Sequence, residues 1–194
     1  MINKEIDNLI YNVSLNLRFE IDLHVCHTMT PLGPMTIVAS QEYLYMSKFL
    51  SCSTIEEDFK IVSNLLKCRY LQGKTDLMLA TIKQLREYFY GYRKYFDLPI
   101  DMIGTNFQKD VWKSLMKIPF GQTVSYSDIA NSLGNRGASI SVGQALRKNK
   151  FAIVVPCHRV IGKNRSFVGY NAGLWRKQNL IQRESLIELK DSSK

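Results

Sequence analysis

Residues 124–148 read VSYSDIANSLGNRGASISVGQALRK, and this stretch decides how the second half of the chain folds. Ser125 and Asp128 are spaced as in a capping box, which predicts that a helix begins at this point. That helix is expected to end at Gly134, and a second helix is expected over residues 138–148. Two short helices joined by a tight glycine-containing turn are typical of a helix-turn-helix.

The second of these helices has two different faces. Its buried stripe is expected to consist of Ala138, Val142, Ala145 and Leu146. The opposite, exposed face carries Ile140, Gln144, Arg147 and Lys148. Cations and an amide suit phosphates and a groove of nucleic acid, and an apolar side chain can act as a wedge between bases. Two plainer interpretations stay open, since helical pairs of this kind also occur in enzymes and a lone surface isoleucine needs no function.

Charge supports a partner that is a polyanion. The chain has 194 residues and a net charge of +9, and residues 1–100 carry 11 basic and 11 acidic side chains. Residues 101–194 carry 15 basic against 6 acidic side chains, so the whole excess lies in the second half. Nucleic acid is the first candidate partner, a membrane surface is the second, and a merely soluble basic face is the remaining possibility.

Composition excludes several classes of protein. Hydrophobic residues make up 45% and charged residues 22%, so wholesale disorder is excluded. The longest apolar run, Phe151–Val155, is far shorter than the roughly 20 residues of a membrane span. The first residues mix charges before any apolar block, unlike a secretory signal, so we expect a cytoplasmic protein, or a nuclear one in a eukaryote.

No metal site is expected. The cysteines at positions 26, 52, 68 and 157 should stay reduced in that compartment. His24, Cys26 and His27 offer three potential ligands within four residues, but a closed zinc site needs a fourth. On a strand His24 and Cys26 would share one face and His27 the other, so ordinary strand side chains are the expected outcome.

The pattern along the chain predicts an α+β protein. Residues 1–18 form an arm of unknown role, and residues 19–95 form a small amino-terminal antiparallel β-sheet domain with helices. Its expected strands are residues 19–28, 35–40 and 43–50, and its expected helices are 57–70 and 76–92. Residues 96–104 are expected to be a linker. Residues 105–190 form a mostly helical, winged-helix-like domain with the helix-turn-helix, opened by a capping box at 105–108 and closed by a helix over 174–189.

A reactive site is indicated just after Phe151–Val155, which is expected to be a buried strand. Cys157 follows with His158 and Arg159 beside it, and nearby cations stabilise a thiolate. In an extended chain Cys157 and His158 would point to opposite sides, so either the chain turns here or a water relays the proton. Glu184 lies on the inward stripe of the last helix and is available to orient His158. An inert buried cysteine and an exposed glutamate are the plainer alternatives.

These motifs resemble a known family, the O6-alkylguanine-DNA alkyltransferases (methylated-DNA–protein-cysteine methyltransferases). Pro156-Cys157-His158-Arg159-Val160-Ile161-Gly162 is similar to the family's active-site signature, and Gly169–Leu174 is similar to its substrate-pocket loop. Residues 120–126 and 129–130 resemble the approach to its helix-turn-helix. Residues 30–33 and 96–99 also match, and the match runs from about residue 28 to 187 with the motifs in order.

The resemblance implies a chemistry for four residues. Cys157 would attack the alkyl carbon on O6 of guanine in a single in-line displacement. His158 would take the thiol proton through a water, and Glu184 would hold the imidazole. Tyr126 would donate a hydrogen bond or proton to the departing guanine; otherwise it is a core aromatic at a helix start. The product would be a thioether, so the protein would be consumed once, with neither cofactor nor metal.

The resemblance also implies a binding surface for double-stranded DNA containing alkylated guanine, and it implies that the protein is a monomer. The helix-turn-helix would turn the damaged base out of the duplex through the minor groove. The base pocket would be lined by Val160, Tyr170 and Asn171, with Asn149 bracing the turn that leads to it. Contacts to the DNA backbone would come from Ser127, Asn135 and Lys163, alongside the exposed helix face of Ile140, Gln144, Arg147 and Lys148. Plain turn and surface chemistry is the alternative for each.

Two departures from the family pattern bear on function. The family usually has an arginine where this chain has Ile140, which predicts weaker or slower base flipping. The ligands of some relatives' amino-terminal zinc site have no ordered match in residues 1–100. A damage sensor without transfer activity, a Cys-His-Glu hydrolase and a plain transcription regulator are the other classes weighed. A hydrolase would need an oxyanion hole and repeated turnover, and a regulator would not need residues 156–159.

Overall fold

The computed structural model describes Asn8 and residues 19–192, so the arm expected over residues 1–18 lies almost wholly outside the described residues. The described chain forms two compact units, each of which is considered by itself. The first unit holds residues 19–89 and Phe96–Ile103, and the second holds Tyr90–Tyr95 and the chain from Gly104 onward. The chain therefore passes between the units three times. The domain boundaries expected at residues 18, 95 and 104 stay predictions.

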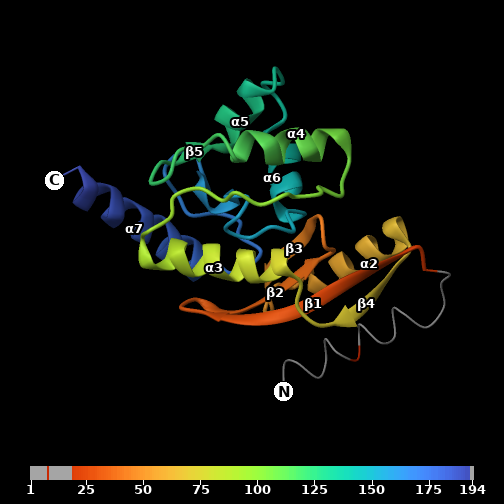
Figure 1. Ribbon diagram of the computed structural model, residues 1–194. Helices are drawn as coiled ribbons and strands as arrows, with labels where there is room; N and C mark the ends of the chain where they lie inside the picture. Colours follow the sequence, from red (N-terminus) through yellow and green to blue (C-terminus); the bar gives the residue numbers. More distant parts are fainter. Residues whose placement is uncertain (1–7, 9–18, 193–194) are drawn as a thin grey trace. The chain divides into compact units, whose positions relative to one another are not determined.

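A four-stranded mixed sheet forms the centre of the first unit (Figure 1), in the order β3-β2-β1-β4. The strands are β1 (Ile21–Thr30), β2 (Gly33–Ala39), β3 (Leu44–Phe49) and β4 (Cys68–Gln72). β1, β2 and β3 are antiparallel neighbours, and β4 pairs with β1 in parallel. The turn between β1 and β2 places Gly33 at φ 109°, a conformation that favours glycine. The α+β fold class is confirmed, and the sheet is mixed rather than wholly antiparallel.

The fourth strand corrects the helix expected over residues 57–70. The two helices of this region are α2 (Ile55–Leu66) and α3 (Asp76–Tyr90). α2 ends because Lys67 adopts a left-handed conformation, with φ 45° and ψ 49°. Beyond it, Cys68 and Tyr70 are buried while Arg69 is exposed, which is the alternation of a strand. Because the helical spacing of apolar residues continues to residue 66, the change to the alternating pattern of a strand directly after it was missed.

The core of the first unit lies between α2 and the sheet. Apolar residues of all four strands pack against Phe59 and Val62 of α2. Every residue of β3 is buried, including Lys48, whose ammonium pairs with the buried carboxylate of Asp58 and donates to Thr54. Burying a charge is costly unless it is paired, so this ion pair is what allows a lysine inside the strand.

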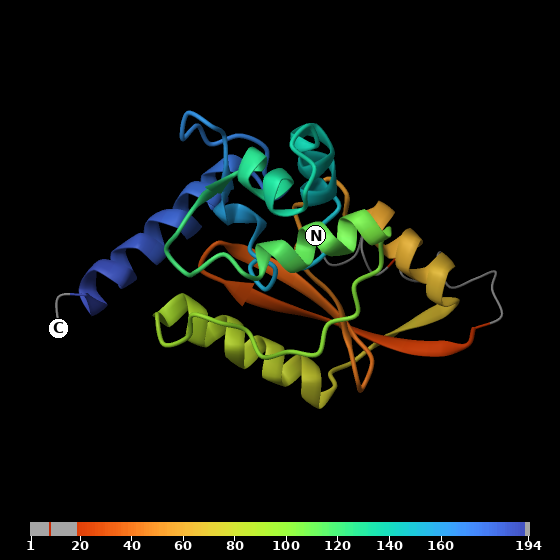
Figure 2. The same cartoon turned by 90° about the horizontal axis from the view of Figure 1, so that it is seen from above.

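The second unit is mostly helical, as the sequence predicts. Its elements are α4 (Asn106–Leu115), β5 (Val124–Ser125), α5 (Tyr126–Ser132), α6 (Ser139–Arg147), η1 (Cys157–Arg159), β6 (Val160–Ile161) and α7 (Leu174–Asp191). Both expected capping boxes are confirmed, at Thr105 with Gln108 and at Ser125 with Asp128. α5 and α6 pack on each other and on α4 (Figure 2). The buried Trp112 of α4 donates from Nε1 to the carbonyl oxygen of Ala145 in α6, over 2.9 Å.

The strand expected over Phe151–Val155 is wrong, although its burial is correct. All five residues are buried, but the backbone turns: the amide of Val155 donates to the carbonyl oxygen of Phe151 over 2.8 Å. Ile153 has a φ of 72°, which no strand residue adopts. A short apolar run identifies a buried segment and does not distinguish a strand from a packed turn. No helix among the described residues has the length and apolarity to cross a membrane.

Candidate active site

Cys157 begins a tight turn. η1 is a single turn of 3-10 helix after Pro156, in which the amide of Arg159 donates to the carbonyl oxygen of Pro156 over 3.0 Å. The chain therefore turns between Cys157 and His158, which is the first of the two possibilities that the sequence left open. Cys157 is 8% exposed, so the thiol is nearly enclosed by the fold.

Asn149 contacts the sulfur directly. Its Nδ2 donates to Sγ of Cys157 over 3.2 Å and to the carbonyl oxygen of Val155 over 3.0 Å. Its Oδ1 accepts from the amide of Phe151 over 2.9 Å. One buried amide thus fixes the packed turn of residues 151–155 and also donates to the thiol. A donor at this place favours the thiolate over the thiol.

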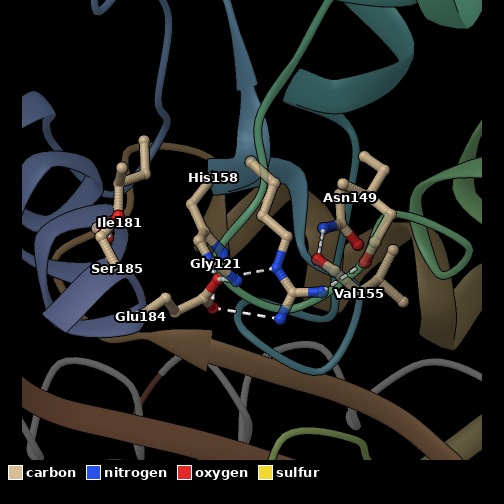
Figure 3. Close-up of polar contacts among 9 residues, drawn as sticks. Gly121, Asn149, Val155, His158, Ile181, Glu184 and Ser185 are labelled. Carbon is tan, nitrogen blue, oxygen red and sulfur yellow. Dashed lines mark hydrogen bonds and ion pairs between the residues drawn. The ribbon is translucent and has the colours of Figure 1, made fainter. Parts of the chain in front are cut away.

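Glu184 is the centre of a buried hydrogen-bond network (Figure 3). Its carboxylate accepts from Nε2 of His158 over 2.8 Å and from the backbone amide of Gly121 over 3.1 Å. Arg159 donates to the same carboxylate from Nε over 2.9 Å and from Nη2 over 3.1 Å. Nη1 of Arg159 donates to the carbonyl oxygen of Ile118 over 2.7 Å. Glu184 is 1% exposed, so the inward position expected from its helical phase is confirmed.

The protonation states in this network follow from burial and charge. Burial alone would raise the pKa of Glu184, but hydrogen bonds and electrostatic attraction, from His158 first and then from Arg159, hold that pKa at about 2. Burial lowers the pKa of His158 below its usual range, against the opposing pull of Glu184. The imidazole is therefore neutral at pH 7. Because an ionised carboxylate only accepts, Nε2 carries the ring proton and Nδ1 has a free lone pair.

The pairing of β5 with β6 explains why Tyr126 belongs to the same site. Val124 pairs with Val160 and Ser125 with Ile161, so the start of α5 lies beside the end of η1. The electrostatic influence of Cys157 reaches Tyr126: burial raises the pKa of this phenol, and negative charge on Cys157 raises it further. Tyr126 is therefore protonated at neutral pH and is able to donate.

Tyr126 and Lys177 meet at one carbonyl group. The hydroxyl of Tyr126 donates to the carbonyl oxygen of Val168 over 3.1 Å, and Nζ of Lys177 donates to the same oxygen over 2.6 Å. Nζ also donates to Gly169 over 3.4 Å and lies 6.0 Å from the centre of the Tyr126 ring. Burial lowers the pKa of the fully buried Lys177 to about 8, with negative charge on Cys157 opposing the shift.

The residues expected in the base pocket come from two segments, the end of η1 and the loop between β6 and α7. Val160 is buried directly after η1, whereas Tyr170 and Asn171 are half-buried in the loop between β6 and α7. Nδ2 of Asn171 donates to the carbonyl oxygen of Arg147 over 3.2 Å, which ties this loop to the end of α6. The loop therefore contacts both helices of the helix-turn-helix, through Tyr126 and through Arg147.

The residues expected on the DNA lie on the surface. Asn135, Ile140, Gln144, Arg147 and Lys163 are exposed, and Ser127 and Lys148 are half-buried. Ile140 is the most prominent of them on α6, with 79% of its side chain exposed. The hydroxyl of Ser139 donates to that of Ser127 over 3.4 Å, which connects the first turns of α5 and α6. Their contacts with DNA stay predictions.

The sequence predicted a different role for Arg159, and it did not single out Lys177. Arg159 was expected beside the thiol, but its guanidinium is directed to Glu184 and Ile118. Lys177 lies seven residues before Glu184 and three before Leu180, so it shares their inward stripe, and this phase was the available signal. Among the described residues no group of His, Cys, Asp and Glu has the arrangement of a metal site.

Comparison with known proteins supports one family over both units. The family model for the 6-O-methylguanine DNA methyltransferase ribonuclease-like domain matches residues 24–102, and the model for the DNA-binding domain of the same family matches residues 106–186. A methylated-DNA–protein-cysteine methyltransferase of Shigella flexneri is 38% identical over 166 residues, which is 82% of this chain and 94% of that protein. The constitutive enzyme of the same name from Bacillus subtilis is 44% identical over 142 residues, 73% of this chain and 82% of that protein.

Solved structures lead to the same family. The crystal structure of Mycobacterium tuberculosis OGT in complex with DNA is similar with a TM-score of 0.72 and 33% identity, covering 86% of this chain and 94% of that chain. The O6-methylguanine methyltransferase structure from the same organism matches with a TM-score of 0.72 and 35% identity, covering 84% of this chain and 93% of that chain. On these grounds the chain belongs to the family of the methylated-DNA–protein-cysteine methyltransferases.

Proposed function

We propose that this protein repairs alkylated DNA by direct reversal, moving the alkyl group of an O6-alkylguanine to Sγ of Cys157. One observation carries the proposal: in a chain of this family, Cys157 accepts a hydrogen bond from Asn149 at the start of a turn whose next residue is the Glu184-bound His158. The substrate is double-stranded DNA containing O6-alkylguanine, with O4-alkylthymine as a further candidate base, and the protein acts as a monomer.

The thiol loses its proton to His158. Nδ1 of His158 is buried, carries the free lone pair, and has no hydrogen-bond partner among the described residues. It is therefore the base that accepts the thiol proton, through a water molecule as the resemblance implies. Glu184 keeps Nε2 protonated and stabilises the imidazolium that forms, as the orienting carboxylate does in other nucleophile–base–carboxylate sets. Asn149 stabilises the thiolate by donating to it.

The displacement forms one bond and breaks one bond. The sulfur lone pair forms a bond to the alkyl carbon, and the bond between that carbon and O6 breaks, with its electron pair passing to the guanine. Tyr126 supplies the proton or hydrogen bond that neutralises the departing base. The ammonium of Lys177 shares the Val168 carbonyl oxygen with Tyr126, so it stabilises negative charge that develops at the phenol.

The target atom is unreachable inside a duplex, so the base must leave the stack before it reacts. The surface of α5 and α6 would bind the minor groove, with Ile140 projecting from α6 as the wedge. Isoleucine wedges by shape but offers no hydrogen bond to the orphaned cytosine. Flipping would accordingly be the weak step of the cycle in this chain.

The reaction would consume the protein. An S-alkylcysteine is a thioether without a good leaving group, so no step restores the thiol. One molecule would repair one lesion, with neither cofactor nor metal taking part.

Intact-mass measurement tests the proposal. The protein is incubated with an excess of duplex carrying one O6-methylguanine, and its mass is measured together with the remaining lesion. We expect the mass of one methyl group, located on Cys157, and at most one lesion repaired per protein. Cys157→Ser should gain no mass and repair nothing, whereas Cys26→Ser, which removes a buried thiol of the first unit, should react as the parent does.

The same measurement separates the other functional classes. Binding of the duplex without any added mass would identify a damage sensor. Ile140 makes this the main alternative, because weak base flipping would leave binding without transfer. Repair of many lesions by one molecule, or repair by Cys157→Ser, would exclude the proposed mechanism.

A further inference from the structure

The loop between β6 and α7 and the first turn of α7 expose an unusual number of apolar side chains. The exposed fractions are 40% for Phe167, 43% for Val168, 45% for Leu174 and 50% for Trp175. The proposed chemistry gives none of these four side chains a role. Of the two tryptophans in the chain, Trp112 is completely buried, so Trp175 is the one with an accessible indole.

The indole of Trp175 is held in place from beneath. The guanidinium of Arg176 lies 4.4 Å from the centre of the ring, and Arg176 itself is 8% exposed. Nη1 of Arg176 donates to the carbonyl oxygen of Ala172 over 2.6 Å, which fixes the guanidinium. A Cβ at Gly173 would lie 3.4 Å from the indole, so the ring rests against the backbone there. The aromatic surface is therefore oriented before any ligand arrives, which lowers the entropy cost of using it.

The loop that leads to Trp175 is hydrogen-bonded to both helices of the helix-turn-helix in the same unit. Asn171, four residues before Trp175, is hydrogen-bonded to the last residue of α6, and Val168 is hydrogen-bonded to the first residue of α5. The loop also carries two exposed cations, Lys163 and Arg165. In Figure 2 the loop projects beside α5. Cations interleaved with exposed aromatic rings are the composition that binds single-stranded nucleic acid.

We propose that Trp175 is a stacking platform for an unpaired nucleobase of the bound DNA strand. The inference rests on the proposed function, because it extends the DNA-binding surface of that function from α5 and α6 to the first turn of α7. Every base has a π-face, so stacking on the indole requires no particular sequence. The cation beneath the ring and the cations of the loop compensate the negative charge of the strand that the base belongs to.

The platform offers this protein a means to hold DNA that is locally open. A flipped lesion leaves neighbouring bases without part of their stack, and a single-stranded segment exposes all of its bases. Since Ile140 offers no hydrogen bond to the opened site, an aromatic contact at Trp175 would hold part of the opened strand instead.

Intrinsic fluorescence and affinity test the inference with one probe, an unmodified single-stranded oligonucleotide at low salt. Stacking should quench the emission of the exposed Trp175, and Trp175→Phe should lose this change while the buried Trp112 still emits. Trp175→Ala should weaken binding about five-fold or more, because one base–aromatic stack accounts for at least that factor. Trp175→Phe, which keeps an aromatic face, should lose less. Tyr92→Ala removes an exposed aromatic elsewhere in the unit and should bind as the parent does.

Unchanged emission at saturating oligonucleotide, or equal affinities for Trp175→Ala and the parent, would overturn the platform. The proposed function has its own readout, the alkylation of Cys157 by a methylated duplex. An alkylated Cys157 with no response at Trp175 would leave the repair function standing without the platform. Quenching at Trp175 with an unmodified Cys157 would support the platform and contradict the repair function.

Discussion

The side-chain amide of Asn149 bonds at the same time to the sulfur of Cys157, to the carbonyl oxygen of Val155 and to the amide of Phe151. It therefore joins the end of the helix-turn-helix to the reactive atom through a single side chain. Anything that changes this amide is expected to change both the packed turn and the reactivity of the thiol.

Asn149→Asp tests the effect of this amide on the thiol. The carboxylate preserves an acceptor for the amide of Phe151, but it places negative charge against the sulfur and disfavours the thiolate. We expect about a tenfold lower rate of Cys157 alkylation by iodoacetamide at pH 7.5, and a rate profile that moves to higher pH. Asn171→Asp, a matched change on the pocket loop, should leave the profile in place. Equal rates for Asn149→Asp and the parent would show that the amide does not act on the sulfur.

Glu184→Gln should destabilise the protein strongly. The change leaves the buried guanidinium of Arg159 without its compensating charge, and breaking a buried ion pair in this way costs about 3–5 kcal/mol. Replacing both partners, in Glu184→Leu with Arg159→Met, should cost less than the sum of the two single changes. Urea unfolding measures these free energies, and strict additivity would contradict a direct coupling between the two side chains.

His158 should make the stability depend on pH in the mildly acidic range. Burial lowers its pKa in the folded protein, so below about 6.5 the unfolded chain takes up a proton that the folded protein does not. The free energy of unfolding is therefore expected to fall as the pH drops from 7 to 5. Urea titrations across this range should show a shallower dependence in His158→Gln, and identical slopes would refute the assignment.

Glu184 should act in a separate, more acidic window. Its pKa is lowered from 4.5 to about 2 in the folded protein, so its stabilisation is complete above about 4.5 and is lost as the pH falls toward 2. Unfolding followed below pH 4.5 measures this loss. The loss should be smaller in Glu184→Gln, where only other carboxyls with lowered pKa values, such as Asp22 and Asp128, still contribute to it.

Lys177→Met should separate stability from reactivity. The ammonium is buried and donates to the main-chain oxygens of Val168 and Gly169, so an apolar side chain of similar length should cost little stability or increase it. Alkyl transfer to Cys157 should slow about tenfold, since both the anchor of the Val168 carbonyl and the positive charge are removed. Single-turnover rates from quenched mass spectrometry, set beside urea midpoints, test both parts. An unchanged rate would leave Lys177 with a role in packing alone.

Ile140→Arg should accelerate repair of duplex DNA. Ile140 is 79% exposed on α6, so the longer side chain is accommodated without repacking, and it adds hydrogen-bond donors for the opened base pair. The parent should react faster with a single-stranded substrate than with a duplex, and the variant should narrow that difference. No gain on duplex DNA would mean that Ile140 does not limit flipping.

The sequence predicted those parts of the fold that are determined locally. The capping boxes at Thr105 and Ser125 depend on residues three positions apart, and both are present. The inward position of Glu184 followed from helical phase alone. The end of α2 was missed because Lys67, rather than a glycine, takes the left-handed conformation, and no residue type marks that choice.

The rest of the site depends on contacts between distant segments. The turn at Phe151–Val155 is stabilised by Asn149 and by a positive φ at Ile153, and an apolar run does not show either feature. Helical phase could have placed Lys177 on the inward stripe, but its hydrogen-bond partners are main-chain oxygens, which the sequence does not reveal. The residues themselves indicated a reactive Cys157 with His158 beside it, whereas alkyl transfer to Cys157 and the role of Tyr126 came from the resemblance to a family. All of these roles stay predictions until alkyl transfer is measured.

Residues 90–95 belong to the second unit, although residues of the first unit precede and follow them in the chain. Lys94 in this segment pairs with Glu188 over 2.7 Å and with Asp191 over 2.8 Å, near the end of α7. A fragment cut at Gly104 would therefore leave the last turns of α7 without their cation. Chimeras that exchange the second unit with a relative should transplant this short piece as well, which requires three splice points instead of one.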